Sequence, residues 1–191
     1  MIVSLVLKMH PLPAHYQVKR ARMRQRILVP LDGSKPAEEA ISYVQALIAP
    51  ETSEIHLLTV LPDIGRLENL VEFPFVNTEL QEAGKVAQRQ QEQFTRAYLD
   101  MIAWGLEDMG YQVHTHIAYG HPAMSIVHMA QALDVSLVIM TSHGRGENVQ
   151  WNYGGVAQRV LDACACPILV IPVRDRIRKA STASSEEQLA A

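Results

Sequence analysis

The chain has 191 residues, 48% of them hydrophobic and 19% charged, which is enough for one domain with a substantial core. It has no apolar run of the ~18 residues that a membrane-spanning helix requires. The opening segment, MIVSLVLKMH, has no basic residue before its apolar stretch and no small-residue cleavage site. We therefore expect a cytoplasmic protein without a secretory signal.

The net charge of −3 hides an asymmetry between the body of the chain and its ends. Residues 27–173 hold 7 Lys or Arg and 17 Asp or Glu, whereas residues 1–26 hold 6 basic residues and no acidic one. An acidic surface repels nucleic acid and anionic lipid. Contact with either is therefore expected only through the basic N-terminal extension.

These patterns divide the chain into three parts. Residues 1–25 are expected to be a flexible basic extension, residues 26–174 the folded domain, and residues 175–191 a disordered tail. Met23 is an alternative start, since MRQRILVPLDGS would be an ordinary beginning for such a domain. In that case residues 1–22 would not be translated.

Within the domain, strand patterns alternate with helix patterns. Apolar runs predict buried strands at 26–31, 54–61, 135–140 and 167–173, and an alternating run predicts another at 111–120. Helical periodicity lies at 32–48, 79–109, 121–133 and 154–164. This order predicts an α/β fold, an open five-stranded, mostly parallel sheet with helices on both faces and right-handed crossovers.

The helix predicted over 79–109 is expected to bury one apolar stripe and to end at Gly110. The predicted stripe includes Val86, Phe94, Ala97, Leu99, Ile102 and Leu106.

In an open α/β sheet, the ligand crevice lies beyond the carboxyl ends of the strands, where the strand order switches. Three segments are expected to meet there: Asp32 to Ser34, Val60 and residues 141–155. Backbone N–H groups of Gly155 and Val156, at a helix start, would suit phosphate oxygens. Glycines alone do not establish a nucleotide site, because ordinary turns use the same residues.

Several stretches resemble the universal stress protein family over residues 26–173. They are ILVPLDGS, YGHPAMSIVHMA, SHGRG and GGVAQRVLDACACPILVIPV. Gly144, nine residues and Gly154 match the second half of that family's loop motif, Gly-x2-Gly-x9-Gly-Ser/Thr. The resemblance implies a Rossmann-like fold of the adenine nucleotide alpha hydrolase type. It also implies a stress-response protein that binds ATP, with or without Mg²⁺.

Carried over position by position, the resemblance assigns a nucleotide-binding set. Adenosine contacts fall on Pro30, Asp32 and the backbone of Val60, and phosphate contacts on Met140, Gly144, Gly154, Gly155 and Val156. Asp32 would equally suit a cap on the first helix turn.

Two positions depart from the motif. Thr141 stands where the first Gly belongs, which requires a negative φ there, and Gly155 stands where the Ser/Thr belongs. Gly155 keeps its N–H but lacks a hydroxyl. Glu147 adds negative charge to the loop, which Arg145 would offset.

The family resemblance also implies a homodimer, joined along Ile168 to Ile171 at the edge of the sheet. Three functions stay open: an ATP-binding protein, a dimeric interaction module with an empty site, and a slow ATPase, for which no catalytic base is identified.

Histidine provides no catalytic set, and no metal site is predicted. His114 and His116 lie two apart on one face of a predicted strand, and no third ligand is evident from the sequence. His143 lies in the glycine-rich loop and is interpreted as structuring it.

Overall fold

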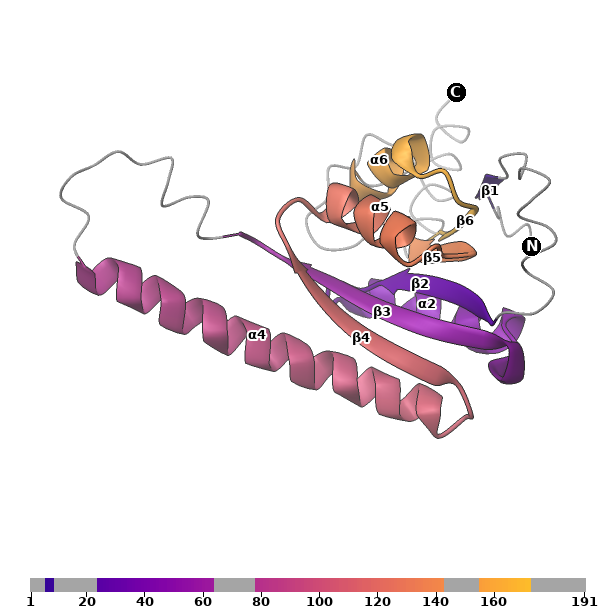
Figure 1. Cartoon of the computed structure of the whole chain (residues 1–191), viewed down its shortest axis with the longest axis horizontal. Helices are drawn as coiled ribbons and strands as arrows, with labels where there is room; N and C mark the ends of the chain where they lie inside the picture. The colour runs from indigo at the N-terminus through magenta and orange to yellow at the C-terminus, as the bar shows by residue number, and fades with distance from the viewer. Residues whose placement is uncertain (1–5, 9–23, 64–77, 143–154, 173–191) are drawn as a thin grey trace, which may run out of the picture.

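The computed structural model describes residues 6–8, 24–63, 78–142 and 155–172. They form a six-stranded sheet in the order β1-β6-β5-β2-β3-β4 (Figure 1). The strands are β1 (Val6–Lys8), β2 (Gln25–Pro30), β3 (Ser53–Leu61), β4 (Gln112–Tyr119), β5 (Leu137–Thr141) and β6 (Ile168–Ile171). Strands β2 to β6 are parallel, which confirms the predicted α/β sheet.

Two pairs of helices cover the sheet, one pair on each face. α2 (Lys35–Leu47) and α4 (Thr78–Glu107) contribute to one core cluster, which is built around Ile27, Ile55 and Leu57. α5 (Pro122–Ala132) and α6 (Gly155–Ala163) contribute to the cluster on the opposite face, around Leu28 and Leu58. Consecutive residues of β2 and β3 therefore enter opposite cores, because side chains alternate along a strand. A 3-10 turn, η2 (Pro50–Thr52), precedes β3.

The first strand lies outside the predicted fold. β1 pairs antiparallel with β6, with Val6 opposite Val170 and Lys8 opposite Ile168. The expectation that the last strand forms the sheet edge is therefore wrong, because β1 takes that position. The apolar stretch that contains β1 suits a strand, and the N–H and C=O groups of β6 offer it partners.

The long helix α4 ends as predicted, with Gly110 following at a φ of 89°. Its buried stripe differs from the prediction. Leu99 and Leu106 are buried against the sheet, but Val86 and Phe94 are 50% and 75% exposed. Those two residues lie on the other side of the helix, because 100° per residue places Phe94 ~140° from Leu99. Within the described residues, no helix has the length and apolarity to cross a membrane.

Candidate functional site

The strand order switches between β2 and β5. From β2 the chain moves through β3 to β4 on one side, and then returns to place β5 and β6 on the other side. The carboxyl ends of β2 and β5 therefore diverge into loops that leave in different directions, which opens a crevice in folds of this kind. Asp32 follows β2, and Ser142 follows β5.

The turn after β2 is held by Asp32 and Ser34. Asp32 Oδ1 accepts hydrogen bonds from the backbone N–H of Ser34 at 2.9 Å and from its hydroxyl at 2.5 Å. Ser34 Oγ in turn accepts from the N–H of Ala37 at 3.3 Å, so Ser34 rather than Asp32 caps α2. Gly33 sits at a φ of 74°, which a glycine adopts without strain. The carboxylate of Asp32 is thus fixed at the end of β2, half-buried rather than enclosed.

The neighbouring strand supports this turn. Thr59 Oγ1 donates a hydrogen bond to the Leu31 carbonyl at 2.9 Å, and the Leu31 N–H donates to the Leu58 carbonyl at 2.8 Å. Pro30 is the last residue of β2, and Val60 lies close to the end of β3 and is partly buried. Three residues of the predicted adenosine set, Pro30, Asp32 and Val60, thus lie at or near the carboxyl ends of adjacent strands.

The end of β5 is buried. Met140 packs its side chain into the core beneath α5 and α6, so only its main chain would be available to a ligand. Thr141 is the last residue of β5, and its φ is not positive, so the β-branched side chain fits there without strain. Ser142 donates its N–H to the Ile171 carbonyl at 2.7 Å, which ties this end to β6.

The start of α6 is open. Gly155 is its first residue and is exposed, and a Cβ built there has no atom within 4 Å outside its immediate neighbours. Val156 is 36% exposed. The first N–H groups of a helix lack intrahelical partners and carry partial positive charge, so this end suits an anion. The remaining predicted contacts, Gly144, Arg145 and Gly154, lie outside the described residues, as do His143 and Glu147.

The sequence patterns did not indicate one cation near this helix start. Arg159 lies one turn after Gly155, and its Nη1 is 2.6 Å from Nε2 of His121, the residue that precedes α5. This pair links the N-terminal end of α5 to the middle of α6. The spacing of four residues from Gly155 was the signal that could have indicated it, since such residues share one helix face.

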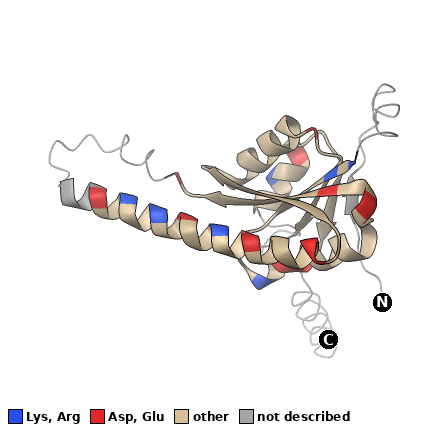
Figure 2. Ribbon diagram, turned by 60° about the horizontal axis from the view of Figure 1, so that its bottom comes forward, with Lys and Arg blue, Asp and Glu red and all other residues tan. Residues whose placement is uncertain are grey.

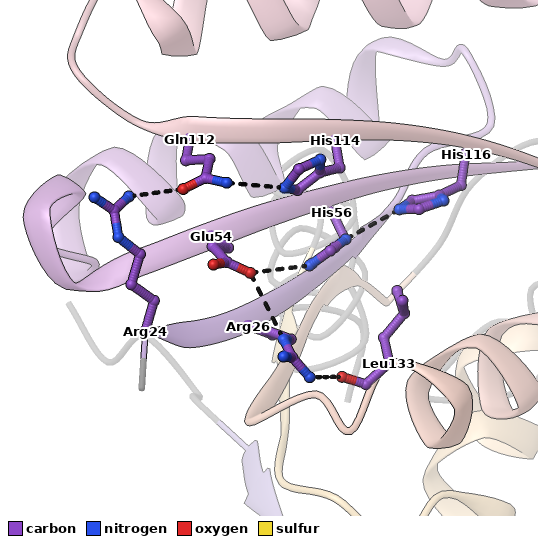
Figure 3. A network of polar contacts seen from close by, with 8 residues as sticks. All are labelled: Arg24, Arg26, Glu54, His56, Gln112, His114, His116 and Leu133. Carbon is purple, nitrogen blue, oxygen red and sulfur yellow. Dashed lines mark hydrogen bonds and ion pairs between the residues drawn. The ribbon is translucent and has the colours of Figure 1, made fainter. Parts of the chain in front are cut away.

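A second polar cluster lies at the opposite end of β3 and β4 (Figure 3). His56 Nδ1 is 3.0 Å from His116 Nε2, and the His56 ring stacks on His114 and His116 with centroids 5.0 and 5.3 Å away. The structure thus supplies a third histidine, which sequence spacing did not reveal. No three His, Cys, Asp or Glu side chains among the described residues are arranged to hold a metal ion.

Glu54 and Arg26 lie beside this cluster, and neither forms a hydrogen bond with His56. Glu54 Oε2 is 4.0 Å from His56 Nε2 and 3.6 Å from Arg26 Nε, and Arg26 Nη1 donates to the Leu133 carbonyl at 2.8 Å. Burial, followed by the neighbouring histidines and Arg26, lowers the pKa of His56 to about 4. Burial also lowers the pKa of His116. The lowered pKa values of His56 and His116 favour their neutral forms, which suits a structural role for the stacked rings.

The described residues also form a shallow groove of about 470 Å³ between α2 and α4. It is lined by Glu38, Ser42, Met101 and Leu106 among others, and it lies along the helices rather than at the strand ends. It therefore shares no residue with the crevice.

Together the parallel sheet and its switch point define an open, doubly wound α/β protein. The chain belongs to the universal stress protein family, whose model matches residues 23–172. It is 29% identical over 156 residues to universal stress protein MJ0577 of Methanocaldococcus jannaschii, covering 78% of this chain and 95% of that protein. It is 28% identical to MJ0531 of the same organism, covering 77% and 81%.

Solved structures agree with this fold. The structure of MJ0577 superimposes with a TM-score of 0.66 at 27% identity, covering 78% of this chain and 96% of that one. An Arabidopsis thaliana universal stress protein with AMP bound gives a TM-score of 0.54 at 16% identity, covering 78% and 91%. A universal stress protein in complex with cAMP gives 0.55 at 15% identity, covering 79% and 98%. At these last two identities the likeness concerns the fold.

Proposed function

We propose that this chain binds an adenine nucleotide, ATP with or without Mg²⁺, in the crevice between β2 and β5, as a cytoplasmic stress-response protein. One observation carries the proposal: the fixed carboxylate of Asp32 and the open start of α6 both lie at the carboxyl side of the sheet, on either side of the switch point. The AMP and cAMP complexes of proteins with the same fold support the choice of an adenine nucleotide.

The two ends of the crevice suit the two ends of a nucleotide. Asp32 would accept hydrogen bonds from the adenosine part, near the main chain of Val60. The N–H groups of Gly155 and Val156 would meet the phosphates, with help from the helix dipole. Arg159, one turn further along α6, would add positive charge. No residue is assigned as a catalytic base, so we propose binding and at most slow hydrolysis.

The alternative within the family is an interaction module that leaves the crevice empty. The absence of a hydroxyl at Gly155 favours it, because a hydrogen bond to a charged group contributes ~1.5–3 kcal/mol. A homodimer through Ile168 to Ile171, which the family resemblance implies, would require β1 to leave the edge of β6.

Gly155→Glu separates nucleotide binding from an empty crevice. A glutamate in the first turn of a helix stabilises the helix but repels phosphate, and the site has room for its Cβ. We expect the wild-type chain to melt at a higher temperature with millimolar ATP and Mg²⁺. The variant should fold normally and lose that shift.

Gly84→Glu is the matched control, since Gly84 also has open space around its Cβ and lies on α4. It should keep the ATP-dependent shift. A wild-type chain that retains no nucleotide through purification and shows no shift with ATP would establish the empty-site alternative.

A further inference from the structure

The helix α4 carries a second apolar row on the face opposite the sheet. Phe94, Met101 and Trp104 are 75%, 62% and 72% exposed. They belong to a row of exposed residues spaced alternately by four and three positions, which we call the outer seam. Its members are Ala83, Ala87, Gln90, Phe94, Ala97, Met101, Trp104 and Asp108.

This spacing is that of the a and d positions of a coiled coil, where apolar residues repeat every 3.5 positions. Single exposed apolar side chains are common, but a row of large ones along one face marks an interaction surface. The sheet already holds the opposite face of the helix through Leu99, Ala103 and Leu106. The outer seam therefore has no role in the core of the domain.

We propose that the outer seam binds the outer seam of a second copy of this chain, with the two α4 helices antiparallel. A two-fold axis between Thr95 and Arg96 places Phe94 opposite Ala97 of the second copy. The same register places Trp104 opposite Ala87 and Met101 opposite Gln90. Each large side chain then meets a smaller one, which is how facing layers of helices fill space without voids.

The charges of α4 favour the antiparallel direction. Its basic residues lie in the first two-thirds, whereas the last part carries acidic residues only (Figure 2). In the proposed register Arg89 lies beside Asp100 of the second copy, on the same flank of the seam, and the two-fold axis makes this pair twice. A parallel arrangement would instead bring the two acidic ends and the two negative dipole ends together.

The size of the seam is compatible with a specific dimer. From Ala83 to Asp108, which follows the last residue of α4 and still donates its N–H to the Trp104 carbonyl, the chain rises ~37 Å. Half of a ~10–12 Å cylinder of that length gives roughly 600 Å² for each copy. The total of roughly 1,200 Å² is the lower end of stable protein–protein interfaces. α4 also extends beyond the sheet at its N-terminal end, so that part of the helix projects from the body of the domain (Figure 1).

Met101→Glu tests the proposal, and Met124→Glu is its matched control. Both methionines are exposed, by 62% and 50%, but Met124 lies on α5. We expect sedimentation of the wild-type chain at micromolar concentration to show a dimer. Met101→Glu should raise the dissociation constant of the dimer ~10-fold or more. Met124→Glu should leave that constant unchanged.

A charge exchange tests the register. Arg89→Asp or Asp100→Arg alone should weaken the dimer, and the two together should restore it. A wild-type chain that is monomeric at every concentration, a Met101→Glu chain that stays dimeric, or a failed rescue would overturn the proposal.

Tryptophan fluorescence distinguishes a second copy on the outer seam from two other occupants, another part of the same chain and a different protein. In a Trp151→Phe chain, Trp104 is the remaining tryptophan, and its emission should shift to the blue as concentration rises. A blue-shifted emission that does not depend on concentration would show that the chain itself covers the seam, and a shift only on adding another protein would identify a different partner. Either result would overturn the proposal.

Discussion

His56 and His116 lie 3.0 Å apart between Nδ1 and Nε2, with their rings stacked. His56 Nε2 has no hydrogen-bond partner among the described residues, because Glu54 Oε2 at 4.0 Å is too distant. Protonating His56 would place a charge in a buried site between His114, His116 and Arg26. The lowered pKa values of His56 and His116 mean that the folded cluster favours the neutral forms of these two rings.

This relationship predicts acid sensitivity. The folded-state pKa of His56, about 4, lies below its ordinary value of 6.5, so the unfolded chain binds more protons between these values. The contribution of neutral His56 to the free energy of unfolding is therefore fully present above pH ~6.5. It is lost as the pH falls towards 4, by roughly 1–3 kcal/mol. Urea unfolding across this range should show the loss. His56→Gln should flatten the profile and His128→Gln, at an exposed position, should not.

Gly155→Ser is expected to tighten nucleotide binding. The substitution restores the hydroxyl that the family motif has at the start of α6, and the open space around Gly155 accommodates its side chain. A hydrogen bond from this hydroxyl to phosphate would add ~1.5–3 kcal/mol, or a ~10- to 100-fold lower Kd for ATP. Calorimetric titration measures it. An unchanged Kd would show that the phosphates do not reach this residue.

Ser34→Ala should lower both stability and nucleotide affinity. It removes the cap of α2, which costs ~1 kcal/mol, and it releases Asp32 from its hydroxyl partner. Ser42→Ala serves as the control, because Ser42 is exposed within the same helix, where alanine is the better helix former. If Ser34→Ala lost stability but bound ATP normally, Asp32 would be confined to a structural role.

Removing β1 should increase self-association. Deletion of residues 1–9 exposes the N–H and C=O groups of β6 that now face Val6 to Lys8. Light scattering should show species larger than those of the full chain, and replacing residues 5–9 by Gly and Ser should act similarly. An unchanged mass would mean that the β6 edge does not pair with other chains. Val170 cannot be used for this test, because it is 1% exposed and a charge there would disturb the core.

The sequence by itself determined the five parallel strands and the helices between them. Local rules suffice for these features. Continuous apolar runs require strands buried on both faces, Ser34 and Pro36 start a helix, and strand–helix alternation leads to right-handed crossovers. The turn at Asp32 and the helix start at Gly155 followed from the same rules, because they are adjacent to these elements in the chain.

Only the tertiary structure decided which faces and edges are occupied. Periodicity gave α4 its apolar residues but could not separate the stripe around Leu99 from the row around Phe94, since both repeat at helical spacing. Likewise, the pairing of β1 with β6 and the meeting of His56 with His116 join residues that lie 60 or more positions apart. Such contacts depend on how the strands are ordered in the sheet, and no local pattern in the sequence records that order.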